Sequence, residues 1–356
     1  MSKMALAIKY RPQSFNDMTE QSAIKDILEN QIKTKTFQHG YLFTGPAGTG
    51  KTTSARIFAN MINEGKGNPI EVDAASNSGV DNIRQIIEDA KRKPLDAEYK
   101  ILIIDECDSL SNGAWQALLK TLEEPPKFTI FILCTTDPQK IPNTILSRVQ
   151  RYQFNKISTD GIRERLETIC IKENSQDYDD PDLRDIGDIS RTDEALDYIA
   201  KISKGGMRDA ITLLDKCLSL SHDLTLDNVL DVVGAEDYGT FFEFLKKLCL
   251  KDEKSISIIE QVYNAGKDIK QFMKDFAKFI LEVEKYLLYE QSESYISIPM
   301  TEENKESLDY FQELRNEVFD VMELAVEINN QIKWDDDPKT LIELSILLYC
   351  GNKELE

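Results

Sequence analysis

A short glycine-rich segment that ends in Lys-Thr is the clearest chemical signal in the sequence. It is GPAGTGKT, Gly45–Thr52, and it matches the pattern G-x-x-x-x-G-K-[ST] at every position. Glycines at these places let backbone N–H groups close around a β-phosphate, and a following helix adds the positive end of its dipole. We expect Lys51 to reach the β- and γ-phosphates and the Thr52 hydroxyl to take a Mg²⁺ position. A glycine-rich turn that binds nothing is disfavoured, because an apolar strand precedes the motif and a helical pattern follows it.

Two adjacent acids close a later apolar run, ILIIDECD, at Ile101–Asp108. Asp105 is placed to hold Mg²⁺ through water, and Glu106 to polarise an attacking water as a general base. Alone, two acids after a strand would indicate a solvated strand end. Together with the glycine-rich motif they predict the hydrolysis of a nucleoside triphosphate.

Four further polar residues are candidates for contacts to the phosphates of a nucleotide, but their sequence patterns are less specific. Thr135 and Thr136 end the run TIFILCTTDP, where a hydroxyl could sense the γ-phosphate, although threonine is common in strands for conformational reasons. Arg148, in SRVQR, could form an ordinary surface ion pair or serve as an arginine finger for a neighbouring subunit, and spacing alone favours the ion pair. Arg208, in GGMRDA, is expected in the first turn of a helix. A cation there opposes the helix dipole, which hints at an anionic ligand.

The elements that must position these residues alternate between apolar runs and helical patterns. Runs such as Ile101–Ile104 and Ile130–Leu133 are apolar throughout, as expected for strands buried on both faces of a parallel sheet. This alternation predicts an α/β three-layer domain with a parallel sheet and a phosphate-binding loop. The expected strands are Tyr41–Phe43, Ile70–Asp73, Ile101–Asp105, Thr129–Thr135 and Arg151–Phe154, and the expected helices lie near 21–33, 51–63, 81–93 and 112–124.

From Ser158 onward the strand signal disappears and the pattern is helical. The acidic stretch Asn174–Ser190 is predicted to be a solvated loop. We expect three domains, with a phosphate-loop domain at 1–157, a small helical domain at 158–235 and a helical bundle at 236–356. The helices expected in this half are 160–172, 193–204, 207–220, Asp268–Tyr289 and Arg315–Lys333.

The net charge of −20 is unevenly distributed along the chain. Residues 1–157 carry 20 Lys and Arg against 18 Asp and Glu, whereas residues 158–356 carry 23 against 45. Residues that bind phosphate groups are therefore expected in the first half of the chain. A hydrophobic content of 41% with 30% charged residues excludes a largely disordered or fibrous chain, and the 356 residues suit two or three domains.

Composition also disfavours membrane, secretory and zinc-binding roles. No apolar run approaches the roughly 18 residues that span a bilayer, and the start MSKMALAIKYRP lacks a signal-peptide core, which predicts an intracellular protein without a membrane partner. The six cysteines form no C-x-x-C pair and the chain has two histidines, so no zinc site is expected. Reduced, mostly buried thiols are the favoured interpretation.

These motifs together resemble those of a known family. The chain is similar to the gamma/tau subunits of bacterial DNA polymerase III, which are AAA+ clamp-loader ATPases related to the small subunits of replication factor C. The resemblance covers roughly residues 3–220. It is carried by KYRPQSF (Lys9–Phe15), HGYLFTGPAGTGKT (His39–Thr52), EVDAASN (Glu71–Asn77), IDE (Ile104–Glu106), ALLKTLEEPP (Ala117–Pro126), TTDPQKIPNTILSR (Thr135–Arg148) and GGMRDAITLLDK (Gly205–Lys216).

The resemblance implies a role for each matching residue. Tyr10, Arg11 and Pro12 are expected on the adenine side of an ATP pocket, and Asp105 and Glu106 as the Mg²⁺ and catalytic-base pair. Either Thr135 or Thr136 would be the first sensor, Arg148 the arginine finger acting in trans, and Arg208 the second sensor on the helical lid. The expected phosphate-binding residues are Gly45, Pro46, Ala47, Gly48, Thr49, Gly50, Lys51, Thr52 and Thr53, with Thr52 and Asp105 as the metal ligands.

The resemblance also implies a function in DNA replication. ATP binding would assemble an open ring with other clamp-loader subunits, a pentamer in the family, which opens a sliding clamp and places it on primer–template DNA. DNA and clamp would stimulate hydrolysis, and the chain itself would not polymerise. The cofactors are ATP and Mg²⁺ without zinc, the place of action is the cytoplasm, and residues 236–356 would form the oligomerising collar. Helix N-termini near Ser76–Val80 are plausible contacts to DNA phosphates.

Departures from the family pattern keep alternatives open. NEGKGNP, Asn63–Pro69, stands where the family carries a four-cysteine zinc module, and Val149 replaces a cysteine. The sequence ends after the expected collar, which predicts that the long tail of the tau form is absent. A viral or minimal-genome loader fits equally well. The rival functions are another AAA+ DNA motor, of the branch-migration helicase or initiator type, and a non-hydrolysing scaffold subunit of the loader.

Overall fold

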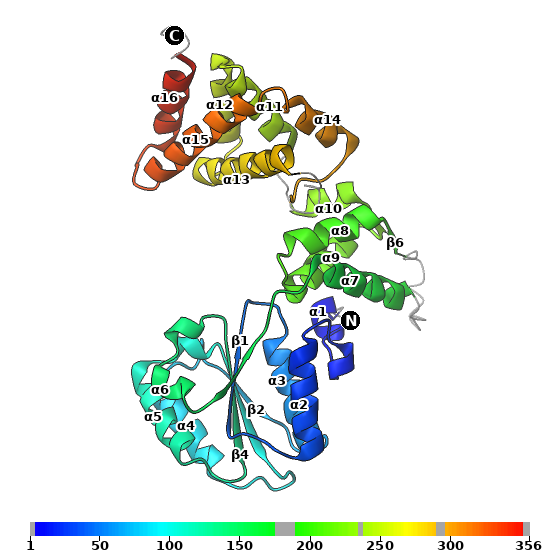
Figure 1. Ribbon diagram of the computed structural model, residues 1–356, viewed down its shortest axis with the longest axis vertical. Coiled ribbons are helices and arrows are strands. Elements are labelled where there is room, and N and C mark those ends of the chain that lie inside the picture. The colour runs from blue at the N-terminus through cyan, green and yellow to red at the C-terminus, as the bar shows by residue number, and fades with distance from the viewer. Residues whose placement is uncertain (1–3, 175–188, 234–237, 290–295, 352–356) are drawn as a thin grey trace. The chain divides into compact units, whose positions relative to one another are not determined.

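The computed structural model describes residues 4–174, 189–233, 238–289 and 296–351. The chain divides into two compact units, Met1–Val232 and Val233–Glu356 (Figure 1). The first unit holds the parallel sheet and a group of helices that follows it, and the second unit is helical. The division into three domains stays a prediction.

A five-stranded parallel sheet forms the centre of the first unit. Its strand order is β2-β3-β4-β1-β5, so strands far apart in the sequence are neighbours in the sheet. The strands are β1 (Gly40–Thr44), β2 (Ile70–Asp73), β3 (Lys100–Asp105), β4 (Thr129–Thr135) and β5 (Gln150–Gln153). All five predicted strands are confirmed, and each observed end lies within one residue of its predicted place.

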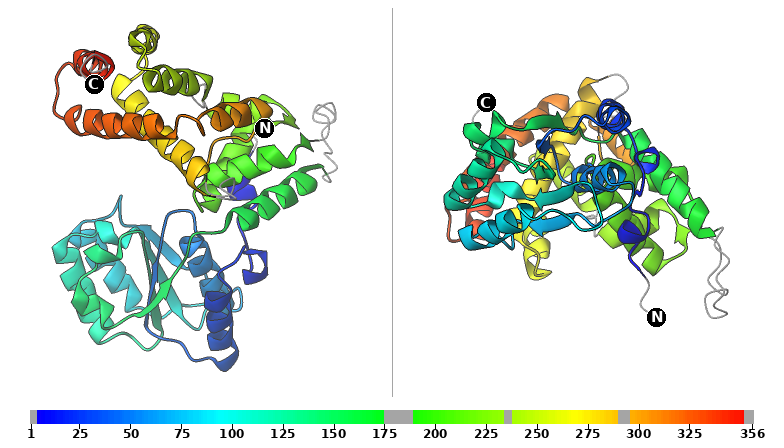
Figure 2. Two further views of the ribbon diagram at one scale, coloured as in Figure 1. Left: turned by 45° about the horizontal axis from the view of Figure 1, so that its top comes forward. Right: turned by 90° about the horizontal axis from the view of Figure 1, so that it is seen from below.

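Helices cover both faces of this sheet (Figures 1 and 2). On β3, Ile101 and Ile103 belong to one apolar cluster, whereas Leu102 and Ile104 belong to the other. Because successive side chains of a strand point to opposite faces, a continuously apolar strand needs a helical layer on each side. The layers are α2 (Ser22–Thr34) and α3 (Lys51–Ile62) on one face, and α4 (Val80–Ala90), α5 (Asn112–Glu123) and α6 (Asn143–Leu146) on the other. The predicted three-layer α/β fold is confirmed.

A small helical subdomain completes the first unit, and we call it the lid. It consists of α7 (Thr159–Asn174), α8 (Asp193–Ile202), α9 (Met207–Leu220) and α10 (Leu226–Val233). The short helix α1 (Leu6–Lys9), which the sequence did not predict, packs against α9. Of the predicted acidic loop, residues 175–188 lie outside the described residues.

The expectation that no strand follows Ser158 was wrong. Two short strands, β6 (Ser190–Arg191) and β7 (Asp223–Leu224), pair in parallel within the lid. Backbone bonds from Ser190 N to His222 O and from Thr192 N to Leu224 O extend this ladder. Strands of two residues are too short to show an alternating pattern, so only the packing of the lid helices reveals them.

The second unit has its own apolar core. The predicted helices Asp268–Tyr289 and Arg315–Lys333 are confirmed as α13 and α15, and the Asp268 carboxylate caps α13 by accepting hydrogen bonds from the backbone N–H groups of Lys270 and Gln271. Phenylalanines fill the core, and the rings of Phe244 and Phe276 have centroids 4.6 Å apart. The helices are α11 (Tyr238–Cys249), α12 (Ile256–Asn264), α13 (Ile269–Leu288), α14 (Glu302–Tyr310), α15 (Arg315–Gln331) and α16 (Pro338–Gly351).

All six cysteines are buried and form no disulfide, as the sequence predicted. Burial raises the pKa of the Cys170 and Cys217 thiols to about 11. These side chains therefore act as small apolar groups in the core. Among the described residues, no helix is both long enough and apolar enough to cross a lipid bilayer.

Replacing Phe276 by Ala should destabilise the second unit by about 3–5 kcal/mol, because a fully buried ring leaves a cavity among the other phenylalanines. Hydrogen exchange measured on peptides of α13 and α15 reports this unit separately from the sheet. The matched control is Phe319→Ala, since the Phe319 side chain is 49% exposed and should matter little. Equal losses for the two variants would contradict the assigned core.

Candidate nucleotide-binding site

The glycine-rich loop connects the end of β1 to the start of α3. Gly45, Gly48 and Gly50 have φ angles of 144°, 72° and 98°, which residues with a Cβ rarely adopt. A Cβ on Gly45 would lie 2.3 Å from the carbonyl oxygen of Phe154. The glycines therefore let the loop curl over the edge of the sheet, with its backbone N–H groups at the first turn of α3, which is the arrangement that binds phosphate.

Lys51 lies beneath this loop at the first position of α3. Its Nζ donates hydrogen bonds to the carbonyl oxygens of Gly45 at 2.8 Å and Pro46 at 2.7 Å. Burial lowers the pKa of Lys51, whereas the charges of Asp105, Asp108 and Glu106 oppose this effect. A buried cation held among acids can interact strongly with an entering anion, because little water screens it.

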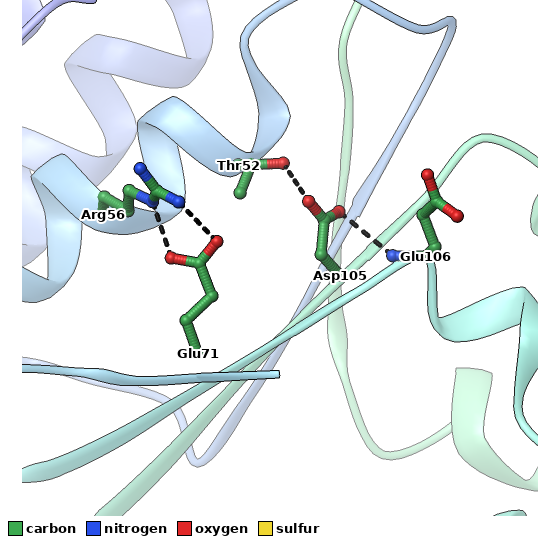
Figure 3. A network of polar contacts seen from close by, with 5 residues as sticks. All are labelled: Thr52, Arg56, Glu71, Asp105 and Glu106. Atoms are coloured by element: carbon green, nitrogen blue, oxygen red, sulfur yellow. Dashed lines mark hydrogen bonds and ion pairs between the residues drawn. The ribbon is translucent and has the colours of Figure 1, made fainter. Parts of the chain in front are cut away.

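The two predicted acids lie opposite the start of α3, as Figure 3 shows. The Thr52 hydroxyl donates to Asp105 Oδ2 at 2.7 Å, and the backbone N–H of Glu106 donates to Asp105 Oδ1 at 3.0 Å. Hydroxyl and carboxylate oxygens are the ligands that Mg²⁺ prefers, so Thr52 and Asp105 fit the metal position predicted for them. Glu106 has a φ of 48°, an uncommon backbone conformation that turns its carboxylate away from the direction of β3 (Figure 3).

The structure separates the two threonines that end β4. Thr135 is buried, and its hydroxyl donates to Asp108 Oδ1 at 2.6 Å while accepting from the backbone N–H of Asp137 at 2.9 Å. Thr136 is exposed to solvent. The N–H of Gly45 also donates to the carbonyl oxygen of Thr135 at 3.3 Å, so Thr135 is joined to both the acids and the phosphate loop.

The lid touches the phosphate loop directly at the start of α9. The backbone N–H of Met207 donates to the carbonyl oxygen of Gly48 at 3.0 Å, and a Cβ on Gly48 would lie 3.0 Å from the Gly206 Cα. This close approach places Arg208 in the first turn of α9, as predicted, where it lines the same cavity as the loop.

That cavity is strongly cationic. Tyr10, Arg11 and Pro12 lie in its wall together with the phosphate loop, as the resemblance implied. Burial lowers the pKa of Arg11, and the nearby guanidinium groups of Arg56 and Arg208 lower it further. The charged side chains in the wall are Arg11, Asp17, Lys51, Arg56, Arg165 and Arg208. An excess of cations around a glycine loop fits a ligand with several negative charges, such as a nucleoside triphosphate.

Arg148 lies away from this cavity and forms contacts within its own chain. Its guanidinium pairs with the Glu123 carboxylate at 2.7 Å and donates to the carbonyl oxygen of Thr144 at 2.6 Å. The side chain remains 33% exposed. Arg148 is therefore not part of the site in its own chain.

Two interactions at the site were missed by the sequence analysis. Asp108 was quoted as the end of an apolar run but given no role, and it holds Thr135. Arg56 and Glu71 form a bidentate pair, with both N–O distances 2.6 Å, which ties α3 to β2 beside the acids (Figure 3). Arg56 lies four residues after Thr52 on one helix face, a spacing that could have identified it.

The chain is similar in sequence to subunits of DNA polymerase III. A family model described as DNA polymerase III, delta subunit, matches residues 70–158. The tau subunit of DNA polymerase III from Bacillus subtilis is 34% identical over 98% of this chain and 64% of its own length. The gamma subunit from Buchnera aphidicola is 31% identical over 79% of this chain and 80% of its own length. The chain thus spans less than two thirds of the Bacillus relative.

Among solved structures, a variant of RuvB from Thermotoga maritima has a TM-score of 0.51 at 18% identity. The match covers 73% of this chain and 87% of that one. At this identity the likeness concerns the fold alone, an AAA+ arrangement of sheet and lid.

Replacing Gly45 by Ala should destabilise the first unit by about 3 kcal/mol, because a Cβ would combine backbone strain with a clash against Phe154. Hydrogen exchange on peptides of β1 and α3, without added nucleotide, measures this loss. Gly79→Ala is the control, since Gly79 has a φ of −73° and open space around its Cα. If the control destabilised the unit as much as Gly45→Ala, the packing described for the loop would be wrong.

Proposed function

The chain belongs to the family of DNA polymerase III gamma/tau subunits, and on that premise we propose that it is the ATPase subunit of a replication clamp loader. One observation carries the proposal. The phosphate loop, with Lys51 and Thr52, lines the same cationic cavity as the lid arginine Arg208, and the Thr52 hydroxyl is bonded to Asp105. A triphosphate bound there would meet the sheet on one side and the lid on the other.

The proposed reaction is hydrolysis of the γ-phosphate of ATP. Lys51 binds the β- and γ-phosphate oxygens, and Thr52 and Asp105 hold the Mg²⁺ that neutralises charge as the bond breaks. Glu106 orients and polarises the attacking water. We assign the first sensor to Thr135 rather than Thr136, because only the Thr135 hydroxyl is joined to an acid of the site. Arg208 reports the γ-phosphate to the lid, and Tyr10, Arg11 and Pro12 face the base.

Arg148 is proposed to complete the site of a neighbouring subunit. The negative charge that develops on the γ-phosphate is stabilised best by hydrogen-bond donors and cations on both sides of it. Within one chain, such groups come mainly from the phosphate loop and the lid. The Arg148–Glu123 pair would then be exchanged for a contact with the neighbour's ATP when the ring forms. Since an exposed ion pair contributes little stability, the exchange is inexpensive.

The partners follow from family membership. We propose that residues 158–235 form the lid, that 236–356 form the collar, and that the chain joins other loader subunits in a ring that opens a sliding clamp on primer–template DNA. The loop before α4, Ser76–Val80, is the proposed contact to DNA phosphates, since Gly79 leaves the N-terminus of that helix without a side-chain cap. Both relatives reported above are bacterial, which supports the bacterial cytoplasm rather than a viral setting.

The rival functions receive less support. The likeness to RuvB concerns the fold alone, and the sequence relatives reported above are polymerase subunits rather than branch-migration helicases or initiators. A non-hydrolysing scaffold would not need Lys51, Thr52, Asp105 and Glu106 together at one site. All four residues are present, and three of them are joined by hydrogen bonds.

Replacing Thr135 by Val should slow ATP turnover about tenfold at saturating ATP, because the variant loses the hydroxyl that is proposed to sense the γ-phosphate and that bonds Asp108 in the structure. The ATP dissociation constant should stay within a few-fold of the unmodified protein. Thr136→Val is the matched control and should turn over ATP normally. Equal turnover in the two variants would remove the assignment of Thr135 as the sensor.

Complementation between subunits tests both the ATPase and the role of Arg148. Lys51→Ala should abolish ATP binding, and Arg148→Ala should lower the clamp- and DNA-stimulated ATPase about a thousandfold. Mixing the two variants should restore part of the activity, because a Lys51→Ala subunit still lends its Arg148 to an intact neighbouring site.

The control for this experiment is each variant alone at the same total concentration. If Arg148→Ala retains full stimulated activity, the arginine acts nowhere in the reaction. If both variants are inactive and mixing restores nothing, Arg148 does not act across subunits.

A further inference from the structure

The N-terminal segment Leu6–Pro12, which we call the strap, belongs structurally to the lid. Leu6 and Tyr10 are buried in the apolar cluster of the lid together with residues of α7, α8 and α9, not in either cluster of the sheet. Both views in Figure 2 show this dark blue segment beside the green lid helices. The strap thus precedes the α/β domain in sequence but packs with the domain that follows it.

Polar contacts fix the strap at both of its ends. The backbone N–H of Leu6 donates to the Asp215 carboxylate on α9 at 3.0 Å. Arg165 on α7 donates to the carbonyl oxygen of Tyr10 at 2.9 Å. Each contact joins the first residues of the chain to a lid helix, so the strap is anchored to α7 and α9 together.

Glu173, near the end of α7, contacts two residues of the strap. Its Oε1 accepts a hydrogen bond from the Tyr10 hydroxyl at 2.5 Å and pairs with Lys9 Nζ at 2.7 Å. Glu173 is only 6% exposed. A buried carboxylate is costly unless it is paired and hydrogen-bonded, so these contacts must form together with the fold of the lid.

The same strap forms one wall of the nucleotide cavity. Ala7, Tyr10, Arg11 and Pro12 line it. Two parts of the cavity wall therefore belong to the lid or are packed on it. They are the strap and the start of α9 with Arg208. A ligand that spans from the phosphate loop to the strap would contact both.

We propose that Glu173 is a positioning residue for nucleotide binding, which acts through Lys9 and Tyr10 to hold the base-side wall of the cavity on the lid. This inference rests on the proposed function. The base-side wall is the part of the cavity wall formed by the strap. It and Arg208 then move together with the lid, so that closing the lid brings both the base and the γ-phosphate of the nucleotide into contact with it. A ligand without a base would depend less on the strap.

Replacing Glu173 by Gln tests this role, because the side chain keeps its size but loses its charge. We expect the ATP dissociation constant to rise about tenfold, in line with the loss of charge-assisted hydrogen bonds. Binding of inorganic tripolyphosphate, which has no base, should weaken much less than ATP binding. Turnover at saturating ATP should also be preserved, because no group that touches the reacting atoms is altered.

Two further variants complete the experiment. Glu167→Gln is the matched control, since Glu167 lies on the same helix and pairs with Arg191 instead of the strap, and it should bind both ligands normally. Tyr10→Phe removes only the hydroxyl that donates a hydrogen bond to Glu173. It should weaken the binding of ATP more than that of tripolyphosphate, but less than Glu173→Gln does.

The outcomes separate the inference from the function on which it rests. If Glu173→Gln and Tyr10→Phe leave ATP affinity unchanged, or weaken ATP and tripolyphosphate equally, Glu173 does not position the base-side wall. If the unmodified protein binds no ATP, the proposed function itself is wrong.

Discussion

The site depends on the register of three adjacent parallel strands. In the order β3-β4-β1, the carboxyl ends lie side by side, and Thr44 is paired with Thr135 in the ladder. Because parallel strands present their carboxyl ends at one edge, the acids after β3, the threonine that ends β4 and the glycine loop after β1 converge without any long side chain reaching across. A slip of one residue in this register would break the pairing of Thr44 with Thr135 and separate the polar groups at the strand ends.

Charged groups of opposite sign lie on different parts of the site. Asp105 ends β3 and Glu106 and Asp108 follow it, whereas the wall of the cavity carries Arg11, Arg56, Arg165 and Arg208. Lys51 is buried and bonded to backbone carbonyl groups. Carboxylates suit a metal ion and arginines suit phosphate oxygens, and a nucleotide with its Mg²⁺ would present both.

The lid is more than a cover for this cavity. The bond from Met207 to Gly48 joins α9 to the phosphate loop, while the strap joins the beginning of the chain to α7 and α9. The first unit therefore encloses its ligand with segments from both ends of its sequence. The second unit has a separate core of packed phenylalanines.

The sequence by itself determined the local features. It identified the phosphate loop, the acids, the five strands and the longer helices, because glycine spacing and apolar patterns act over a few positions. Tertiary structure alone decided what depends on distant pairing. It set the strand order, bonded buried Thr135 to Asp108, paired Arg56 with Glu71, and brought Tyr10 to Glu173 across 163 residues. Such contacts leave no periodic trace in a sequence, because the two partners meet only after the elements between them have packed.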